Sequence, residues 1–212
     1  MQVTVFGASG GIGRHVVAQL LEGGHDVVAY VRNPVKLGRA DPRLRIVEGQ
    51  LSDERSIAEA VRGSDAVVSA LGPTLRRGAT GTPVTDGTRA IVAAMQRLGV
   101  RRLVGLATPS VADPRDAPTL KARMLPVIAG VAFPNALREL VGMTAAVTGS
   151  DLDWTIGRLT RPTDRPATGT VRAGFLGHDT VGSSMTRADI AAWLIAQIDD
   201  STYSRAAPAI SD

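Results

Sequence analysis

Short apolar runs alternate along the chain with longer segments in which apolar residues recur at helical spacing. The apolar residues of the short runs are mostly consecutive, as expected for strands of a parallel sheet that is covered on both faces. These predicted strands are residues 3–6, 26–31, 44–47, 66–69, 103–107 and 152–156. The predicted helices are residues 11–22, 54–62, 84–98, 135–148 and 187–198. Strands alternating with helices predict an α/β fold with a doubly wound parallel sheet.

Turn and cap residues agree with these boundaries. Gly23 and Gly24 follow the first predicted helix, and Gly99 follows the third. Thr186 and Asp189 have the spacing of a capping box at the start of the last helix, although the acid is shorter than the usual Glu.

Two stretches, residues 72–83 and 109–134, are rich in Gly or Pro and are expected to be irregular loops. Each follows a predicted strand and therefore lies at the carboxyl edge of the sheet, where an open α/β fold binds its ligands. No internal repeat or linker divides the chain. We expect residues 1–212 to form a single domain, with a small substrate-cleft portion at about residues 109–134 and 158–185.

The first predicted strand leads directly into a glycine-rich turn, Gly7-Ala8-Ser9-Gly10-Gly11-Ile12-Gly13. In this spacing Gly7 permits the tight turn, Gly10 lets a pyrophosphate approach the backbone, and Gly13 lets the helix pack close to the sheet. The N–H groups at the start of the helix would then point at the phosphates. A turn at this position, after a strand and before a helix, indicates a dinucleotide site.

The end of the second predicted strand indicates which dinucleotide is bound. A carboxylate at this place would bind the ribose hydroxyls of NAD, but residues 30–34 contain no acid. Arg32 offers a planar guanidinium suited to a 2′-phosphate, with Asn33 and Lys36 close by in the sequence. The pattern therefore favours NADPH over NADH. If Arg32 were an ordinary surface residue, the ribose would be left unrecognised.

Composition removes several classes of function. The chain of 212 residues has no cysteine, which excludes disulfides, thiolate metal sites and cysteine nucleophiles. His15, His25 and His178 have no metal-ligand spacing, so no metal is expected. No apolar run approaches the roughly 20 residues that span a bilayer, and the N-terminus lacks the pattern of a signal peptide. We expect a soluble cytoplasmic protein without a membrane partner.

The net charge of +4 does not by itself indicate a nucleic-acid partner. All but two of the 24 basic residues are arginines, and they are scattered along the chain rather than clustered in a stripe. A small-molecule substrate is therefore expected, with the chain acting as a monomer or homodimer.

The sequence resembles the atypical short-chain dehydrogenase/reductases, in the NAD(P)H-binding group that includes NmrA-like proteins and biliverdin reductase B (flavin reductase). The resemblance covers nearly the whole chain and implies a single NAD(P)-binding Rossmann domain. Besides the glycine turn, it is carried by residues 30–34, 49–53, 65–72, 86–88, 151–158 and 186–191.

The resemblance also implies the cofactor-binding residues. The turn would hold the pyrophosphate through Gly7, Ser9, Gly10, Gly11 and Ile12, and Arg32 with Asn33 would hold the 2′-phosphate. Gln50 and Leu51 would contact adenine, although the family often has Asp in place of Gln50. The nicotinamide ribose would lie over Ala70, Leu71 and Gly72. At the end of the fifth strand, where the family usually carries a Ser pair, this chain has Thr108 and Ser110.

The chain departs from the family at the proton donor. Members that reduce carbonyls use a Tyr-x-x-x-Lys pair, but the two tyrosines here, Tyr30 and Tyr203, have no Lys four positions later. Residues 121–144, where the pair belongs, contain no tyrosine. The Arg-Pro-Gly that follows the sixth strand in the family reads Arg158-Leu159-Thr160.

Without this pair, the chemistry that fits is hydride transfer from NADPH to a flavin-, quinone- or tetrapyrrole-like acceptor, which needs no positioned protein acid. Thr108 and Ser110 are the candidate catalytic residues, and Pro109, Met124 and Arg161 are the candidate substrate contacts. Arg161 fits a surface charge equally well. Two alternatives stay open: an NmrA-like NADPH-sensing protein without turnover, and a redox-neutral isomerase or cyclase.

Replacing Gly10 with Val is expected to abolish NADPH binding and to leave the fold largely intact, because the side chain would occupy the space of the pyrophosphate. Binding is measured by NADPH titration and folding by circular dichroism. A folded Gly10→Val protein that bound NADPH like the wild type would show that the turn is not the phosphate site.

Overall fold

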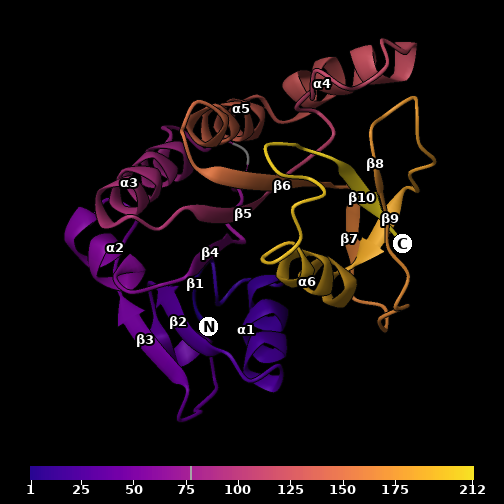
Figure 1. Cartoon of the computed structure of the whole chain (residues 1–212). Helices are drawn as coiled ribbons and strands as arrows, with labels where there is room; N and C mark the ends of the chain where they lie inside the picture. The colour runs from indigo at the N-terminus through magenta and orange to yellow at the C-terminus, as the bar shows by residue number, and fades with distance from the viewer. Residues whose placement is uncertain (77) are drawn as a thin grey trace.

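A computed structural model describes residues 1–76 and 78–212, without the side chains of residues 121–123. Its main sheet has eight strands in the order β3-β2-β1-β4-β5-β6-β10-β8 (Figure 1). The strands are β1 (Gln2–Phe6), β2 (Asp26–Val31), β3 (Leu44–Glu48), β4 (Ala66–Ser69), β5 (Arg102–Ala107), β6 (Asp153–Leu159), β8 (Arg172–Gly174) and β10 (Ala209–Ser211). Among the described strands, only β8 and β10 pair antiparallel. The predicted doubly wound parallel sheet, the Rossmann fold, is therefore confirmed.

Helices cover both faces of this sheet (Figure 1). Helices α1 (Gly13–Glu22) and α6 (Arg187–Ala196) cover one face, and α2 (Glu54–Val61), α3 (Pro83–Leu98) and α5 (Pro134–Thr148) cover the other. The neighbouring residues Val67 and Val68 belong to the two different cores, because successive strand side chains point to opposite faces. Burial on both faces explains why the strands read as continuous apolar runs.

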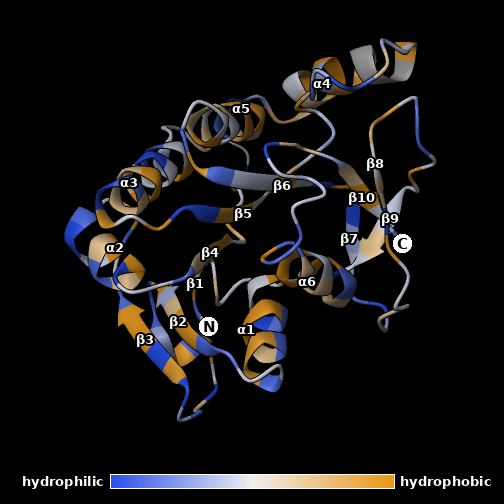
Figure 2. Ribbon diagram, in the orientation of Figure 1, coloured by the Kyte–Doolittle hydropathy of each residue, from blue (hydrophilic) through white to orange (hydrophobic). Residues whose placement is uncertain are grey.

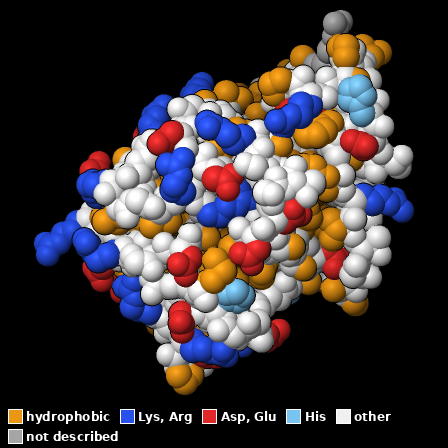
Figure 3. Space-filling view, viewed as in Figure 1, with side chains coloured by type: hydrophobic (Ala, Val, Ile, Leu, Met, Phe, Trp, Pro, Cys, Tyr) orange, Lys and Arg blue, Asp and Glu red, His pale blue; other side chains and the backbone are white. Residues whose placement is uncertain are grey.

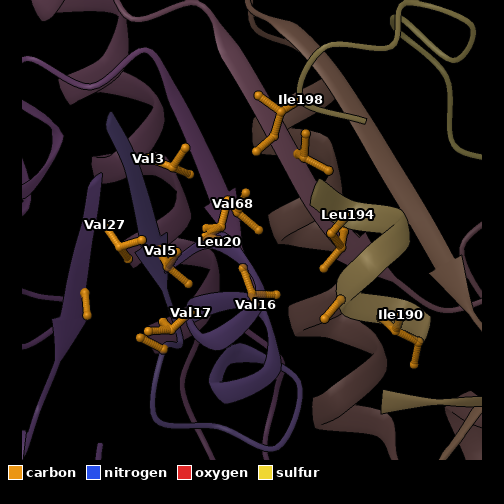
Figure 4. Packing of buried hydrophobic residues seen from close by; sticks show 14 of the residues in the cluster. Val3, Val5, Val16, Val17, Leu20, Val27, Val68, Ile190, Leu194 and Ile198 are labelled. Atoms are coloured by element: carbon orange, nitrogen blue, oxygen red, sulfur yellow. The ribbon is translucent and has the colours of Figure 1, made fainter. Parts of the chain in front are cut away.

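The core under α1 and α6 is built almost entirely from aliphatic side chains. Val16 and Leu20 of α1 lie against Val5 of β1, and Ile190 and Leu194 of α6 join the same cluster (Figure 4). In Figure 2 the apolar residues of the helices lie mainly on the sides that face the sheet. The two helices are therefore held in fixed positions over one face.

One loop prediction was wrong in part. Residues 109–134 were expected to be an irregular loop, yet residues 120–132 form α4 (Leu120–Ala132), which packs against α5. Pro109, Pro114 and Pro118 precede this helix, and only Pro126 lies inside it, where it lacks the N–H of a helical hydrogen bond. The Leu, Met and Ala residues around it are good helix formers and continue the helix across the proline.

Four short strands and one helical turn were not predicted. The strands β7 (Arg161–Thr163), β8, β9 (Ser184–Thr186) and β10 are three residues each, too short to give a periodic signal. β7 and β9 pair in parallel as a separate two-stranded sheet. The turn is the 3-10 helix η1 (Pro34–Lys36).

The cap of α6 differs from the predicted capping box in the use of its acid. The Thr186 hydroxyl accepts the Asp189 N–H at 3.0 Å, as expected for an N-cap. The Asp189 carboxylate instead accepts the N–H groups of Thr168 and Gly169, at 2.8 and 3.1 Å. The cap therefore also ties the loop after β7 to the start of α6.

A buried ion pair holds the segment between β5 and α4. The Arg158 side chain in β6 is fully buried, and its two terminal nitrogens donate to both oxygens of Asp116 at 2.5 and 2.7 Å. Arg158 also donates to the carbonyls of Ala207 and Val111. Asp116 accepts the N–H of Leu176 at 2.9 Å as well. This pair joins the loop after β5, the turn after β8 and the segment before β10.

Replacing Asp116 with Asn is expected to lower the free energy of unfolding by about 3–5 kcal/mol, because the Arg158 guanidinium would stay buried without a counter-charge. Denaturant unfolding measures the change, and the exposed Asp26→Asn serves as the matched control, with an expected change within about 0.5 kcal/mol. A loss for Asp116→Asn as small as that of the control would contradict this role.

The same pair predicts a pH dependence. Burial alone would raise the pKa of Asp116, but the hydrogen bonds from Arg158 and from the Asp113 N–H hold that pKa below its ordinary value of 3.8. A carboxyl whose pKa is lowered by folding stabilises the protein above its unfolded pKa, and the stabilisation is lost as the pH falls through the folded one. The stability difference between wild type and Asp116→Asn should therefore shrink below pH 3.8.

Candidate functional site: the carboxyl edge of the sheet

The glycine turn between β1 and α1 has backbone geometry that side chains would prevent. Gly7 has a φ of +76°, and a Cβ there would lie 2.8 Å from the Ala70 carbonyl. A Cβ at Gly13 would overlap the Gly7 carbonyl oxygen, so this glycine allows the helix to start against the turn. Gly10 and Gly11 are exposed. The turn therefore presents bare backbone to solvent at the start of α1, the arrangement that binds phosphates.

The turn lies beside the end of β4. The Ala70 N–H donates to the Phe6 carbonyl at 2.9 Å, which brings Ala70 and Leu71 alongside Gly7. β1 pairs with β2 on one side and with β4 on the other, so the chain order reverses at this point of the sheet. Such a reversal is where open α/β sheets bind their ligands. The predicted cofactor residues Gly7, Ala70 and Leu71 therefore lie side by side at this point of the sheet.

At the end of β2, the side chain of Arg32 is exposed. Its guanidinium has no hydrogen-bond or ion-pair partner among the residues that the structure describes. Asn33 accepts the Val35 N–H at 3.0 Å through its side-chain oxygen and so caps η1. Its amide group is left as a donor, which is the half of the side chain that a phosphate would use.

The loop that carries Gln50 and Leu51 is held from two sides. The Tyr30 hydroxyl donates to the Gln50 carbonyl at 2.7 Å, and a side chain at Gly49 would collide with that hydroxyl. Leu51 packs on α3 at Gly87. A Cβ added to Gly87 would lie 2.6 Å from the Cβ of Leu51. Burial, with a smaller effect of Asp53, raises the pKa of Tyr30 to about 12. Tyr30 is therefore a protonated donor that positions this loop.

At the end of β5, the Thr108 and Ser110 hydroxyls lie 2.6 Å apart, and either can donate to the other. Both residues, and Pro109 between them, are half-buried. The segment that follows is anchored, because Arg158 donates to the Val111 carbonyl at 3.1 Å. The hydroxyl pair therefore lies on a fixed part of the carboxyl edge.

The predicted substrate contacts outside this loop lie in two different elements. Met124 is exposed on α4, which packs on the α5 side, whereas Arg161 is exposed in β7, beside α6 (Figure 1). Their place in one substrate site stays a prediction.

A further basic residue, not among the predicted site residues, reaches the glycine turn. Arg187, the first residue of α6, lies over Gly11, where a Cβ would be 2.8 Å from its Nε atom. Its Nη1 pairs with Asp164 at 2.6 Å. The neighbouring residues had been interpreted only as a helix cap, and no local pattern reveals that α6 packs against α1.

Other kinds of site find little support in the structure. No three or more His, Asp or Glu side chains lie close enough to hold a metal ion within the described ranges. Every described helix is too short or too polar to span a bilayer. Lys and Arg side chains are spread over the face seen in Figure 3, with acidic residues between them.

The chain belongs to the NAD(P)H-binding family, whose model matches residues 7–201. It is 37% identical over 120 residues to a 3-beta-hydroxysteroid dehydrogenase of Mycolicibacterium neoaurum. The aligned residues make up 52% of this chain and 32% of that protein. A (4-alkanoyl-5-oxo-2,5-dihydrofuran-3-yl)methyl phosphate reductase of Streptomyces griseus is 30% identical over 112 residues, 53% of this chain and 36% of that protein. The chain thus spans about a third of the length of these relatives.

Solved structures share the fold over the entire chain. The anaerobillin reductase ChuY of Escherichia coli O157:H7 aligns with a TM-score of 0.79 at 20% identity, covering 100% of this chain and 97% of that one. A short-chain dehydrogenase/reductase of Veillonella parvula, in complex with NADP, aligns with a TM-score of 0.75 at 19% identity, covering 100% and 94%.

Proposed function

We propose that this protein is an NADPH-dependent oxidoreductase that transfers hydride to a flavin-, quinone- or tetrapyrrole-like acceptor without a tyrosine acid. Membership of the NAD(P)H-binding family supports the cofactor, and relatives named as reductases or dehydrogenases support the reaction type. The tetrapyrrole option agrees with the name of the fold neighbour ChuY. We place it in the cytoplasm as a monomer or homodimer.

The proposed cofactor runs along the carboxyl edge of the sheet. The backbone of the turn at Ser9, Gly10, Gly11 and Ile12, of which Gly10 and Gly11 are exposed, would hold the pyrophosphate, and Arg32 with the Asn33 amide would hold the 2′-phosphate. Gln50 and Leu51 would flank the adenine, with Ala70, Leu71 and Gly72 under the nicotinamide ribose. When bound, NADPH supplies the hydride.

The observation that carries the proposal is that both tyrosine hydroxyls are engaged with backbone carbonyls. Tyr30 donates to Gln50 on the proposed adenine side, and Tyr203 donates to Ala173 at 3.1 Å. Burial raises the pKa of both tyrosines, which makes them weaker acids. An acceptor that requires a positioned phenol is therefore disfavoured.

The stretch where the tyrosine–lysine pair would belong carries a structural carboxylate. Glu139 of α5 is buried, and it accepts the N–H groups of Val84 and Thr85 at 3.1 and 2.8 Å. It thereby caps the start of α3 from a neighbouring helix. With its carboxylate used in this way, Glu139 is not a proton donor in the proposal.

Thr108 and Ser110 are the proposed catalytic hydroxyls. The pair has two O–H groups, and its mutual hydrogen bond uses one of them. The other is free to donate to an oxygen or nitrogen of the acceptor and to orient it. Pro109, with Met124 and Arg161 from residues 109–134 and 158–185, would form the acceptor side of the site.

NADPH should bind the wild type more tightly than NADH, and Arg32→Ala should remove the preference. Losing a charge-assisted contact costs about 1.5–3 kcal/mol, or roughly one to two decades in the dissociation constant. The measurement is a titration of wild type and Arg32→Ala with each cofactor. Equal dissociation constants for the two cofactors in the wild type would contradict the assignment of Arg32.

Flavin- or quinone-like compounds should be reduced far faster than simple ketones, because a missing general acid removes typically 10²–10⁴ in rate from reactions that need one. Thr108→Val should lower turnover modestly, whereas Tyr30→Phe and Tyr203→Phe should retain it. The test is a panel of acceptors at fixed NADPH.

Fast reduction of an unactivated ketone that is lost in either Phe variant would overturn the mechanism. NADPH binding without turnover of any acceptor would instead indicate a sensor.

A further inference from the structure

Arg187, at the start of α6, places a positive charge beside the glycine turn that precedes α1. Its side chain lies beside the exposed Gly11, so closely that a Cβ on this glycine would meet the Nε and Cδ atoms at 2.8 and 3.1 Å. A bare Gly11 therefore serves two purposes. It leaves the backbone open to a phosphate, and it leaves room for the guanidinium stem beside it.

The backbone of Arg187 is held firmly relative to α1. The Gln19 side chain of α1 donates to the Ala188 carbonyl at 3.0 Å, and α1 and α6 share one core. Thr186 caps α6 directly before Arg187. Because the base of the side chain is fixed, only the guanidinium has to adjust when an anion arrives, which reduces the cost of ordering it.

The ion pair that Arg187 makes with Asp164 is weak. Asp164, which pairs with it at 2.6 Å, has a side chain that is 85% exposed, whereas the Arg187 side chain is 26% exposed. An ion pair with so exposed a member contributes little. A diphosphate presents more negative charge and more acceptor oxygens to the same guanidinium, so exchanging one partner for the other is favourable.

We propose that Arg187 binds the diphosphate of the nicotinamide cofactor, and that Asp164 is the counter-ion it leaves when the cofactor binds. The inference rests on the cofactor binding of the proposed function. It assigns Arg187 to a group that NADPH and NADH share, in contrast to Arg32, which is assigned to the 2′-phosphate of NADPH alone.

The experiment compares dissociation constants for NADPH and NADH, measured by direct titration at one low salt concentration. Arg187→Gln should weaken both cofactors by about tenfold or more, to a similar extent, since one charge-assisted contact is lost from each. Arg187→Lys keeps the charge without the fork and should fall between Gln and wild type. Asp164→Asn removes the competing carboxylate and should tighten both cofactors by about two- to fivefold.

Arg89→Gln is the matched control. It removes the same charge and breaks an exposed ion pair with Asp86 on α3, which covers the other face of the sheet. Its dissociation constants should stay within about twofold of the wild type. Circular dichroism and the melting temperature check each variant, and Asp164→Asn tests the exchange even if Arg187→Gln fails to fold.

Three results would overturn the inference. The first is that Arg187→Gln binds both cofactors as tightly as the Arg89→Gln control, and the second is that Arg187→Gln weakens the binding of NADPH alone. The third is that Asp164→Asn weakens the binding of both cofactors as much as Arg187→Gln does. The third would mean that the Arg187–Asp164 ion pair is structural.

Failure of the proposed function is seen separately. A wild type that binds neither cofactor contradicts that function, whereas a wild type that binds without turnover leaves the Arg187 comparison valid.

Discussion

The fully buried Arg158 guanidinium sets the main constraint on the loop that follows β5. A charge at this depth requires a partner and saturated hydrogen bonds, and Asp116 supplies the partner through two contacts. Asp116 lies on a loop without regular structure, so its position is set by the pair. The loop after β5 is therefore fixed to β6, and the Thr108–Ser110 hydroxyls at its start become part of a rigid edge.

The two halves of the carboxyl edge are built by different means. At the ends of β1 and β3, close backbone approaches dominate: Gly7 against Ala70, Gly13 against the Gly7 carbonyl, and Gly49 against Tyr30. After β5 and β7, side chains determine the shape, through the Arg158–Asp116 pair and the Asp189 carboxylate that ties the loop at residues 168–169.

Polar groups inside this fold are mostly used to position segments. Tyr30 holds the Gln50 carbonyl, and Glu139 caps a helix that belongs to another part of the chain. Each could be taken for a catalytic acid from its residue type alone. Their hydrogen bonds to backbone groups show that they position segments, whereas the mutual hydrogen bond of Thr108 and Ser110 uses only one of their two hydroxyl hydrogens.

The sequence alone determined the features that depend on local pattern. Continuous apolar runs revealed β1 to β6, and the spacing of Gly7, Gly10 and Gly13 located the tight turn between β1 and α1, because steric limits on such a turn act within a few residues. The three-residue strands and α4 escaped this reading, since short segments give no period and Pro126 masks a helical one. Only the tertiary structure joined Arg158 to Asp116 and placed Arg187 over Gly11. These contacts link residues far apart in the chain, and they follow from how helices and loops pack on the sheet, which no local spacing encodes.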